Sequence, residues 1–148
     1  MKDEISARLQ FTFKKEERLS GNKLIDELFK NGSSFYLSPF KIIFMASQFS
    51  GEGVTGIRTT PAQVLISVPK RNYRNAVDRN KIKRLIREAY RLNKHLLYNT
   101  LQNKGTRLII AILYTSKKIE PFALIQQKLV EVLTRLAEKN VANESLPA

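Results

Sequence analysis

The residues best suited to chemistry are the arginines and lysines between positions 70 and 94. This segment holds ten basic side chains and only two acidic ones, Asp78 and Glu88. The basic ones are Lys70, Arg71, Arg74, Arg79, Lys81, Lys83, Arg84, Arg87, Arg91 and Lys94. An arginine can donate two parallel hydrogen bonds to phosphate oxygens, and each phosphate that is neutralised releases condensed counterions. The segment therefore favours the binding of a phosphate backbone.

Residues that could hydrolyse a bond are scarce. His95 is the only histidine, cysteine is absent, and no paired-carboxylate or phosphate-loop pattern occurs. A hydrolytic protein needs a nucleophile, a general base or a metal held in one constellation. We therefore expect no catalytic residue, no metal site and no cofactor bound by the protein alone. For His95, near the end of a predicted helix, we expect a structural role or simple exposure.

A helix from about Asn75 to Leu97 is predicted to position the basic residues. Apolar side chains recur three and four residues apart, which places them on one helical face. They are Ile82, Leu85, Ile86, Ala89, Leu92 and Leu96. The opposite face would carry Asn80, Arg84, Arg87, Arg91 and Lys94, with Arg79, Lys83 and Tyr90 along one flank. A solvated surface helix is the alternative, but such helices usually mix both signs of charge.

Length and composition point to a single globular domain that binds a polyanion. The chain has 148 residues, of which 43% are hydrophobic and 26% charged, with a net charge of +13 and a pI near 10.2. These values are typical of a folded domain, and the positive charge favours nucleic acid as the partner. Anionic lipid is the competing partner, but the apolar face of the basic helix is better explained as core.

The sequence also indicates where the protein works. Because there is no cysteine, disulfides and cysteine-based zinc sites are excluded. No apolar run approaches the roughly 18 residues needed to cross a bilayer, and residues 1–10 lack the apolar stretch of a signal peptide. We therefore expect a cytoplasmic protein with no membrane partner.

Hydrophobic periodicity predicts an α+β fold in a single domain spanning residues 1–148. Strands are expected at residues 9–13, 35–49, 64–68 and 107–113. The last of these is apolar throughout, as in a strand buried on both faces. The expected architecture is a sandwich of one mainly antiparallel four-stranded sheet with helices packed on it.

Two further helices and several irregular segments complete the prediction. One helix is expected at 21–30, where Ser20 would cap the start and Gly32 would follow the end. The other is expected at about 120–139. Residues 50–61 are expected to form a mobile hairpin loop, and residues 1–8 and 140–148 are expected to be frayed.

A charged turn precedes the first helix. Its lysines and its arginine, Lys14, Lys15 and Arg18, could contact a nucleic acid. The neighbouring Glu16 and Glu17 carry opposite charge and favour a merely solvated turn. We therefore expect this turn to lie outside the binding surface.

Three stretches of the chain resemble a known family. Residues 67–71 read SVPKR, and residues 75–87 read NAVDRNKIKRLIR. They closely resemble the signature of the protein subunit of bacterial ribonuclease P, whose central RNR motif corresponds here to Arg79 and Asn80 followed by Lys83, Arg84 and Arg87. Residues 15–32 also look like the first-helix region of that family. Because the match is long and ungapped, it is more specific than a short pattern.

The resemblance implies a fold and a function. The fold would be the ribosomal protein S5 domain 2-like class, with a βαβ crossover through the basic helix. The protein would be the accessory subunit of an endoribonuclease, in which the RNA subunit carries the chemistry and uses Mg²⁺ to remove the 5′ leader of precursor tRNA. Its partners would be the ribonuclease P catalytic RNA and precursor tRNA.

Site residues follow from the resemblance where the motif matches. RNA binding is expected from Lys70, Arg71, Arg74, Asn75, Arg79, Asn80, Lys83, Arg84, Arg87 and Arg91. A leader-binding cleft between the first helix and the sheet is expected to involve Ile25, Phe29, Lys41 and Ile43. Simple core packing is the alternative for the three apolar members of that cleft.

Two other classes of function remain open on the sequence. The protein could be a ribosomal or other structural RNA-binding protein. It could also bind DNA, but a recognition helix usually presents base-reading polar side chains, and this face is almost purely phosphate-directed. Since no dimer seam is visible, we expect the free protein to be a monomer.

Overall fold

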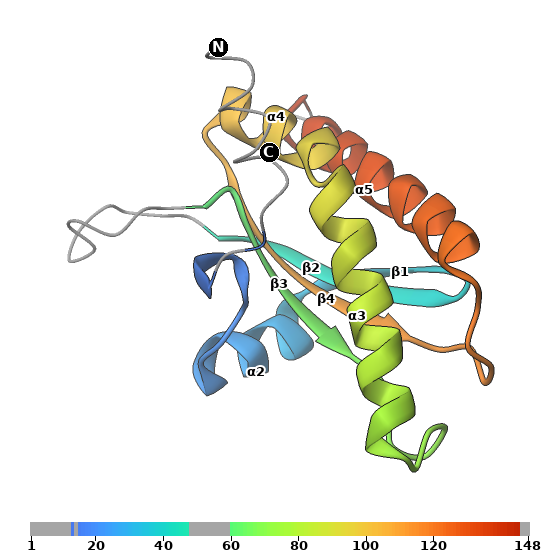
Figure 1. The fold of residues 1–148 in the computed structure, drawn as a ribbon. Coiled ribbons are helices and arrows are strands. Elements are labelled where there is room, and N and C mark those ends of the chain that lie inside the picture. Colours follow the sequence, from blue (N-terminus) through green and yellow to red (C-terminus); the bar gives the residue numbers. More distant parts are fainter. Residues whose placement is uncertain (1–12, 14, 48–59, 146–148) are drawn as a thin grey trace.

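The computed structural model describes residue 13, residues 15–47 and residues 60–145 of the chain (Figure 1). Most of the predicted first strand lies outside these ranges, as do residues 1–8, most of the predicted loop at 50–61, and the last three residues. No helix within the described ranges is both long and apolar enough to cross a bilayer.

The centre of the fold is a four-stranded sheet with the order β1-β2-β4-β3. Its strands are β1 (Ser33–Leu37), β2 (Phe40–Ser47), β3 (Ala62–Ser67) and β4 (Arg107–Tyr114). β1 pairs with β2 and β2 with β4 in antiparallel fashion, whereas β3 and β4 are parallel. The prediction of a mainly antiparallel four-stranded sheet is therefore confirmed. The parallel pair requires a crossover, and the basic helix lies within that crossover, as expected.

The single strand predicted over residues 35–49 is wrong, because the chain turns back at Ser38 and Pro39 and forms the β1–β2 hairpin. Proline cannot donate a ladder hydrogen bond, so it suits a turn between two strands. The hairpin register places Tyr36 opposite Lys41. Paired residues of this kind project from the same face of the sheet.

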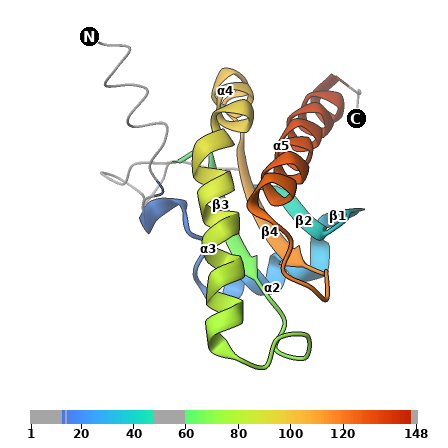
Figure 2. The same cartoon turned by 45° about the vertical axis from the view of Figure 1, so that its right-hand side comes forward.

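Helices cover both faces of the sheet (Figures 1 and 2). They are α2 (Asn22–Asn31), α3 (Ala76–Asn93), α4 (His95–Lys104) and α5 (Phe122–Ser145), preceded by a short 3-10 helix, η1 (Lys15–Glu17). α2 packs on one face, while α3 and α5 lie side by side on the other. α5 extends past its predicted end, and α2 begins after Gly21 with no side-chain hydrogen bond from a cap, so the expected cap at Ser20 is wrong.

Two apolar clusters hold these layers together. The larger one joins the α3 and α5 face to the sheet, and includes Ile82 and Ile86 of α3 with Leu129 of α5. The smaller one lies under α2, where Leu28 packs against Ile43. β4 supplies side chains to both clusters. Its continuous apolar run therefore has the predicted cause, which is burial on both faces.

The predicted single helix through Leu97 is wrong, because it breaks at Lys94 into α3 and α4. The break changes which side chains face the core, so that Leu97 is fully buried and Leu96 is exposed. Tyr90 and Lys94 are also buried, although the periodicity assigned them to the basic side. Both continue the i, i+4 row that starts at Ile82, and this row points inward.

Candidate nucleic-acid interface

A set of cations runs along α3 and the loop before it, and no described carboxylate pairs with them. We call these residues the basic face, and they are Lys70, Arg71, Arg74, Lys81, Lys83, Arg84 and Arg87. All are exposed except Lys83, which is half-buried. None of them forms an ion pair with a carboxylate anywhere in the described part of the chain. Their charge is therefore available to an external anion, which is the condition that the phosphate-binding hypothesis requires.

The loop before α3 is fixed to the helix and to the sheet. The Arg79 guanidinium donates hydrogen bonds to the backbone carbonyls of Tyr73 at 2.7 Å and of Arg74 at 2.9 Å. The Tyr73 hydroxyl donates to the Ser116 carbonyl at 2.7 Å, and burial raises the pKa of Tyr73 to about 12. Arg79 therefore organises the loop from within. The direct RNA contact expected from the motif stays a prediction for this residue.

Arg91 has less free charge than its neighbours on α3. Its guanidinium makes two hydrogen bonds to the Glu88 carboxylate, at 2.6 and 3.1 Å. The hydrogen bond from Arg91 lowers the pKa of Glu88. Because this pair is neutral overall, the positive potential of α3 is concentrated nearer its N-terminus. Asn75 and Asn80, the two predicted amide contacts, are exposed at that end.

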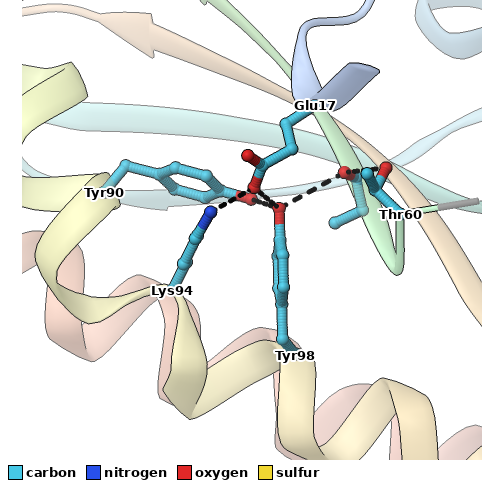
Figure 3. A network of polar contacts seen from close by, with 6 residues as sticks. Glu17, Thr60, Tyr90, Lys94 and Tyr98 are labelled. Carbon is cyan, nitrogen blue, oxygen red and sulfur yellow. Dashed lines mark hydrogen bonds and ion pairs between the residues drawn. The ribbon is translucent and has the colours of Figure 1, made fainter. Parts of the chain in front are cut away.

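A buried polar network lies where α3 meets α4 (Figure 3). The ammonium group of Lys94 donates to the Glu17 carboxylate, and both side chains are only 3% exposed. The Tyr98 hydroxyl donates to the same carboxylate at 2.6 Å, and the Tyr90 hydroxyl donates to Tyr98 at 3.0 Å. Burial and the adjacent carboxylate raise the pKa of Tyr98. The network ties η1 to the helix junction, so the expectation that Glu17 lies in a solvated turn is wrong.

The residues predicted for the leader-binding cleft lie on α2 and on the face of the sheet beneath it. Phe29 is 46% exposed and Lys41 is exposed, so both can reach a ligand. Ile43 is buried and Ile25 is half-buried, and both belong to the cluster under α2. For these two isoleucines the structure favours the core-packing alternative.

A hollow of about 590 Å³ opens on this same face, at the carboxyl ends of β3 and β4. It is lined by Lys41, Ser67, Pro69, Arg71, Asn72, Leu113, Tyr114, Thr115 and Lys117. The three cations in its wall come from β2, from the loop before α3, and from the loop after β4. The hollow therefore connects the sheet side of the molecule to the basic face through Arg71.

Two residues at this hollow were not identified from the sequence. Tyr36 is 60% exposed, projects from the same face as Lys41, and accepts a hydrogen bond from Thr115 at 3.2 Å. Lys117 lies in the wall. The Ser38–Pro39 step was the available signal for Tyr36, because a turn there makes residues 36 and 41 neighbours. Lys117 had no signal, since its position depends on the packing of a loop.

Groups suited to metal binding do not gather in the described part of the chain. No set of three or more histidine, aspartate or glutamate side chains comes together there. His95 is half-buried at the first residue of α4. The basic face supplies cations and hydrogen-bond donors, which are the groups that bind phosphate.

Comparison with known proteins identifies relatives along nearly the whole chain. The family profile described as Ribonuclease P matches residues 13–137. A ribonuclease P protein component from Porphyromonas gingivalis is 34% identical over 136 residues, which cover 92% of this chain and 93% of that protein. Another from Chlorobium phaeobacteroides is 32% identical over 136 residues and covers 86% of this chain and 90% of that protein.

Solved structures agree with this result. The RNase P protein from Staphylococcus aureus superposes with a TM-score of 0.60 at 25% identity, over 82% of this chain and 94% of that chain. The protein from Thermotoga maritima has the same fold, with a TM-score of 0.60 at 24% identity over 80% of this chain and 96% of that chain. The chain therefore belongs to the ribonuclease P protein family, the protein component of an endoribonuclease that processes tRNA.

Proposed function

We propose that the basic face binds the catalytic RNA of ribonuclease P and that the sheet side of the protein binds the 5′ leader of precursor tRNA. The observation that carries this proposal is the absence of acidic partners for the basic face within the described residues. Seven cations held on one helix and its anchored loop repel one another, and binding of an external polyanion would offset this repulsion. A folded RNA holds its phosphates in fixed positions, so that several of them can contact a rigid protein surface at once.

α3 is well suited to hold this surface rigidly. Ile82, Ile86 and Ala89 are fully buried against the sheet and α5, so the helix cannot turn its basic side inward. Its N-terminus adjoins the anchored loop, and the free backbone amides there also favour anions. The contact with the catalytic RNA would therefore centre on Arg84 and Arg87, with Lys70 and Arg71 beside it.

The leader would run from the basic face across the sheet side. Arg71 belongs both to the basic face and to the wall of the 590 Å³ hollow, where Lys41 and Lys117 add charge. Phe29 and Tyr36 offer exposed rings on this side, and unpaired bases stack on such rings. Phosphate contacts and stacking would thus act on the same single strand.

In this proposal the RNA subunit carries the chemistry and holds the Mg²⁺ ions, and the protein improves the binding of substrate and of those ions. Cleavage of precursor tRNA by the cognate catalytic RNA at low magnesium concentration tests this directly. We expect little cleavage by the RNA alone, none by the protein alone, and accurate cleavage at the 5′ end of the mature tRNA when both are present. Measuring product formation with end-labelled substrate gives the result.

The same assay separates the competing class of function. A structural RNA-binding protein outside ribonuclease P would leave the activity of the catalytic RNA unchanged at every magnesium concentration. That outcome would contradict the proposal, even if the protein bound the RNA through phosphate contacts alone.

Tyr36→Ala is expected to weaken binding of precursor tRNA by the reconstituted particle about tenfold, because stacking on one ring is lost. Tyr36→Phe keeps the ring and should bind normally. The affinity for mature tRNA, which has no leader, should be the same for all three proteins. Equal losses for precursor and mature tRNA would show that Tyr36 does not act on the leader.

A further inference from the structure

We propose that Arg18, Lys83 and Arg87 form a pocket for a single backbone phosphate of the RNA partner, between η1 and α3. The proposal rests on the proposed function, because it adds a contact to the RNA-binding surface. It also assigns a role to the charged turn that the sequence places outside that surface.

The pocket is a hollow of about 170 Å³ beside the outer edge of β3. The residues that line it are Phe13, Arg18, Leu19, Val64, Leu65, Ile66, Lys83 and Arg87. The described part of this wall thus has three cations and no acidic side chain. Lys83 and Arg87 are four residues apart and lie on one side of α3, facing the turn that carries Arg18.

Arg18 is held in place by an aromatic ring. Its guanidinium carbon lies 5.4 Å from the centroid of Phe13, which is the arrangement of a cation–π contact. Phe13 in turn packs edge-on against Tyr90, with ring centroids 5.6 Å apart. Tyr90 is fully buried. The guanidinium is therefore pre-organised by a stack that starts in the core, and pre-organisation reduces the entropy lost on binding.

The acidic neighbour of Arg18 does not neutralise it. Glu17 points into the molecule and binds Lys94 and Tyr98, as Figure 3 shows. Arg18 itself is exposed and forms no ion pair with a described carboxylate. The buried network thus separates two adjacent opposite charges. Glu17 acts as a positioning residue, and Arg18 is left for an external anion.

The edge of β3 adds a neutral donor to the three cations. The backbone of Arg18 forms an isolated parallel β-bridge with Val64, and the Leu19 amide donates to the Val64 carbonyl at 2.9 Å. Backbone groups alternate in direction along a strand, so the Ile66 amide faces the same outer edge. A phosphate in the hollow would then meet two guanidinium groups, an ammonium group and a backbone amide. Phosphate is the biological anion that uses such a set of donors best.

The test compares charge-removing variants in binding to the cognate catalytic RNA, measured by filter binding over a series of salt concentrations. Arg18→Gln removes the charge and keeps a polar side chain at the position. Its matched control is Arg135→Gln. Arg135 lies on α5 and makes the same kind of contact, because its guanidinium carbon is 5.2 Å from the centroid of the Phe35 ring. Phe35 belongs to β1, at the edge of the sheet opposite to β3. We expect Arg18→Gln to weaken binding about tenfold and to lower the salt slope by about one. Arg135→Gln should change neither.

Double variants test whether the phosphate is shared. Arg87 lines the hollow and Arg84 does not. If Arg18 and Arg87 hold the same phosphate, the protein with both Arg18→Gln and Arg87→Ala should lose clearly less RNA affinity than the product of the two single losses. Combining Arg18→Gln with Arg84→Ala should give the full product. A full product in both cases would overturn the shared pocket.

The outcomes also separate this proposal from the proposed function. If Arg84→Ala weakens binding and Arg18→Gln does not, the pocket is wrong while the basic face stands. If the wild-type protein shows no salt-dependent binding to the catalytic RNA, the proposed function itself fails. Urea unfolding of each variant confirms that the fold is intact. Arg18 is exposed, so loss of its contact with Phe13 should shift the unfolding midpoint only slightly.

Discussion

Replacing Lys94 with methionine is expected to lower the free energy of unfolding by about 3–5 kcal/mol, because it leaves the Glu17 carboxylate buried without its cation. Methionine retains the length of the lysine stem, so the packing volume changes little. Both partners of the pair are only 3% exposed, and the hydrogen bond from Tyr98 cannot replace a full positive charge. The measurement is urea-induced unfolding followed by circular dichroism.

Lys128→Met is the matched control for this prediction. Lys128 pairs with Glu131 at 3.5 Å on the surface of α5, where the two side chains are 34% and 49% exposed. An exposed pair three residues apart on a helix contributes only about 0.2–0.5 kcal/mol. Equal losses in the two methionine variants would mean that the Glu17–Lys94 pair does not hold η1 to the helix junction.

The second large effect is expected on RNA binding. Arg84→Ala combined with Arg87→Ala should weaken binding to the catalytic RNA about 100-fold at moderate salt, since each arginine that contacts a phosphate contributes about tenfold. The slope of log affinity against log salt should become less steep by about two. Folding should be unaffected, because both side chains are exposed.

Arg91→Ala provides the control within the same helix. Arg91 has the same charge, but its guanidinium is already bound to Glu88. Removing it leaves Glu88 behind, and the change in salt slope should be clearly smaller than for Arg84→Ala alone. If the double variant leaves the slope unchanged while its unfolding midpoint is normal, the basic face does not contact RNA phosphates.

The sequence predicts the basic face well because the signal is local. An apolar row three and four residues apart fixes the buried side of α3, and the exposed side of a helix follows from the same periodicity. The continuous apolar run of β4 is equally informative, since burial on both faces leaves no polar alternation. These features need no knowledge of distant contacts.

The errors concern residues whose environment depends on distant parts of the chain. Lys94 looks like another phosphate ligand, but its partner Glu17 is 77 residues away in sequence. Periodicity alone cannot show that a buried carboxylate will meet a lysine at the end of the apolar row. Tyr90 was misplaced for the same reason, because its hydroxyl is satisfied by Tyr98 in that network.

The environment of the residues proposed to bind the leader could be predicted only in part. Phe29 and Lys41 are exposed as the family resemblance implies, whereas Ile43 is buried in the cluster under α2. Tyr36 takes its place on this side through the β1–β2 register, which becomes clear only when the turn at Pro39 is recognised. Cross-strand neighbours depend on the register of the two strands, so a prediction that misses the turn cannot identify any of them.

The contact between α3 and the catalytic RNA can be tested most directly by placing a cleavage reagent on the protein. The chain has no cysteine, so a single introduced thiol can be labelled with iron-EDTA without competition. Val77 suits this purpose, because it is 77% exposed, carries no charge and lies on the same side of α3 as Arg84, seven residues later. Thr134 on the exposed side of α5 gives the control position.

With Val77→Cys labelled, hydroxyl radicals should cut the catalytic RNA at a few discrete sites, and the cuts should weaken when unlabelled wild-type protein is added as competitor. The Thr134→Cys protein should bind equally well and give few or no cuts at those sites. Strong discrete cuts from position 134 together with none from position 77 would contradict the account, because they would place the RNA against α5 and not against the basic residues of α3.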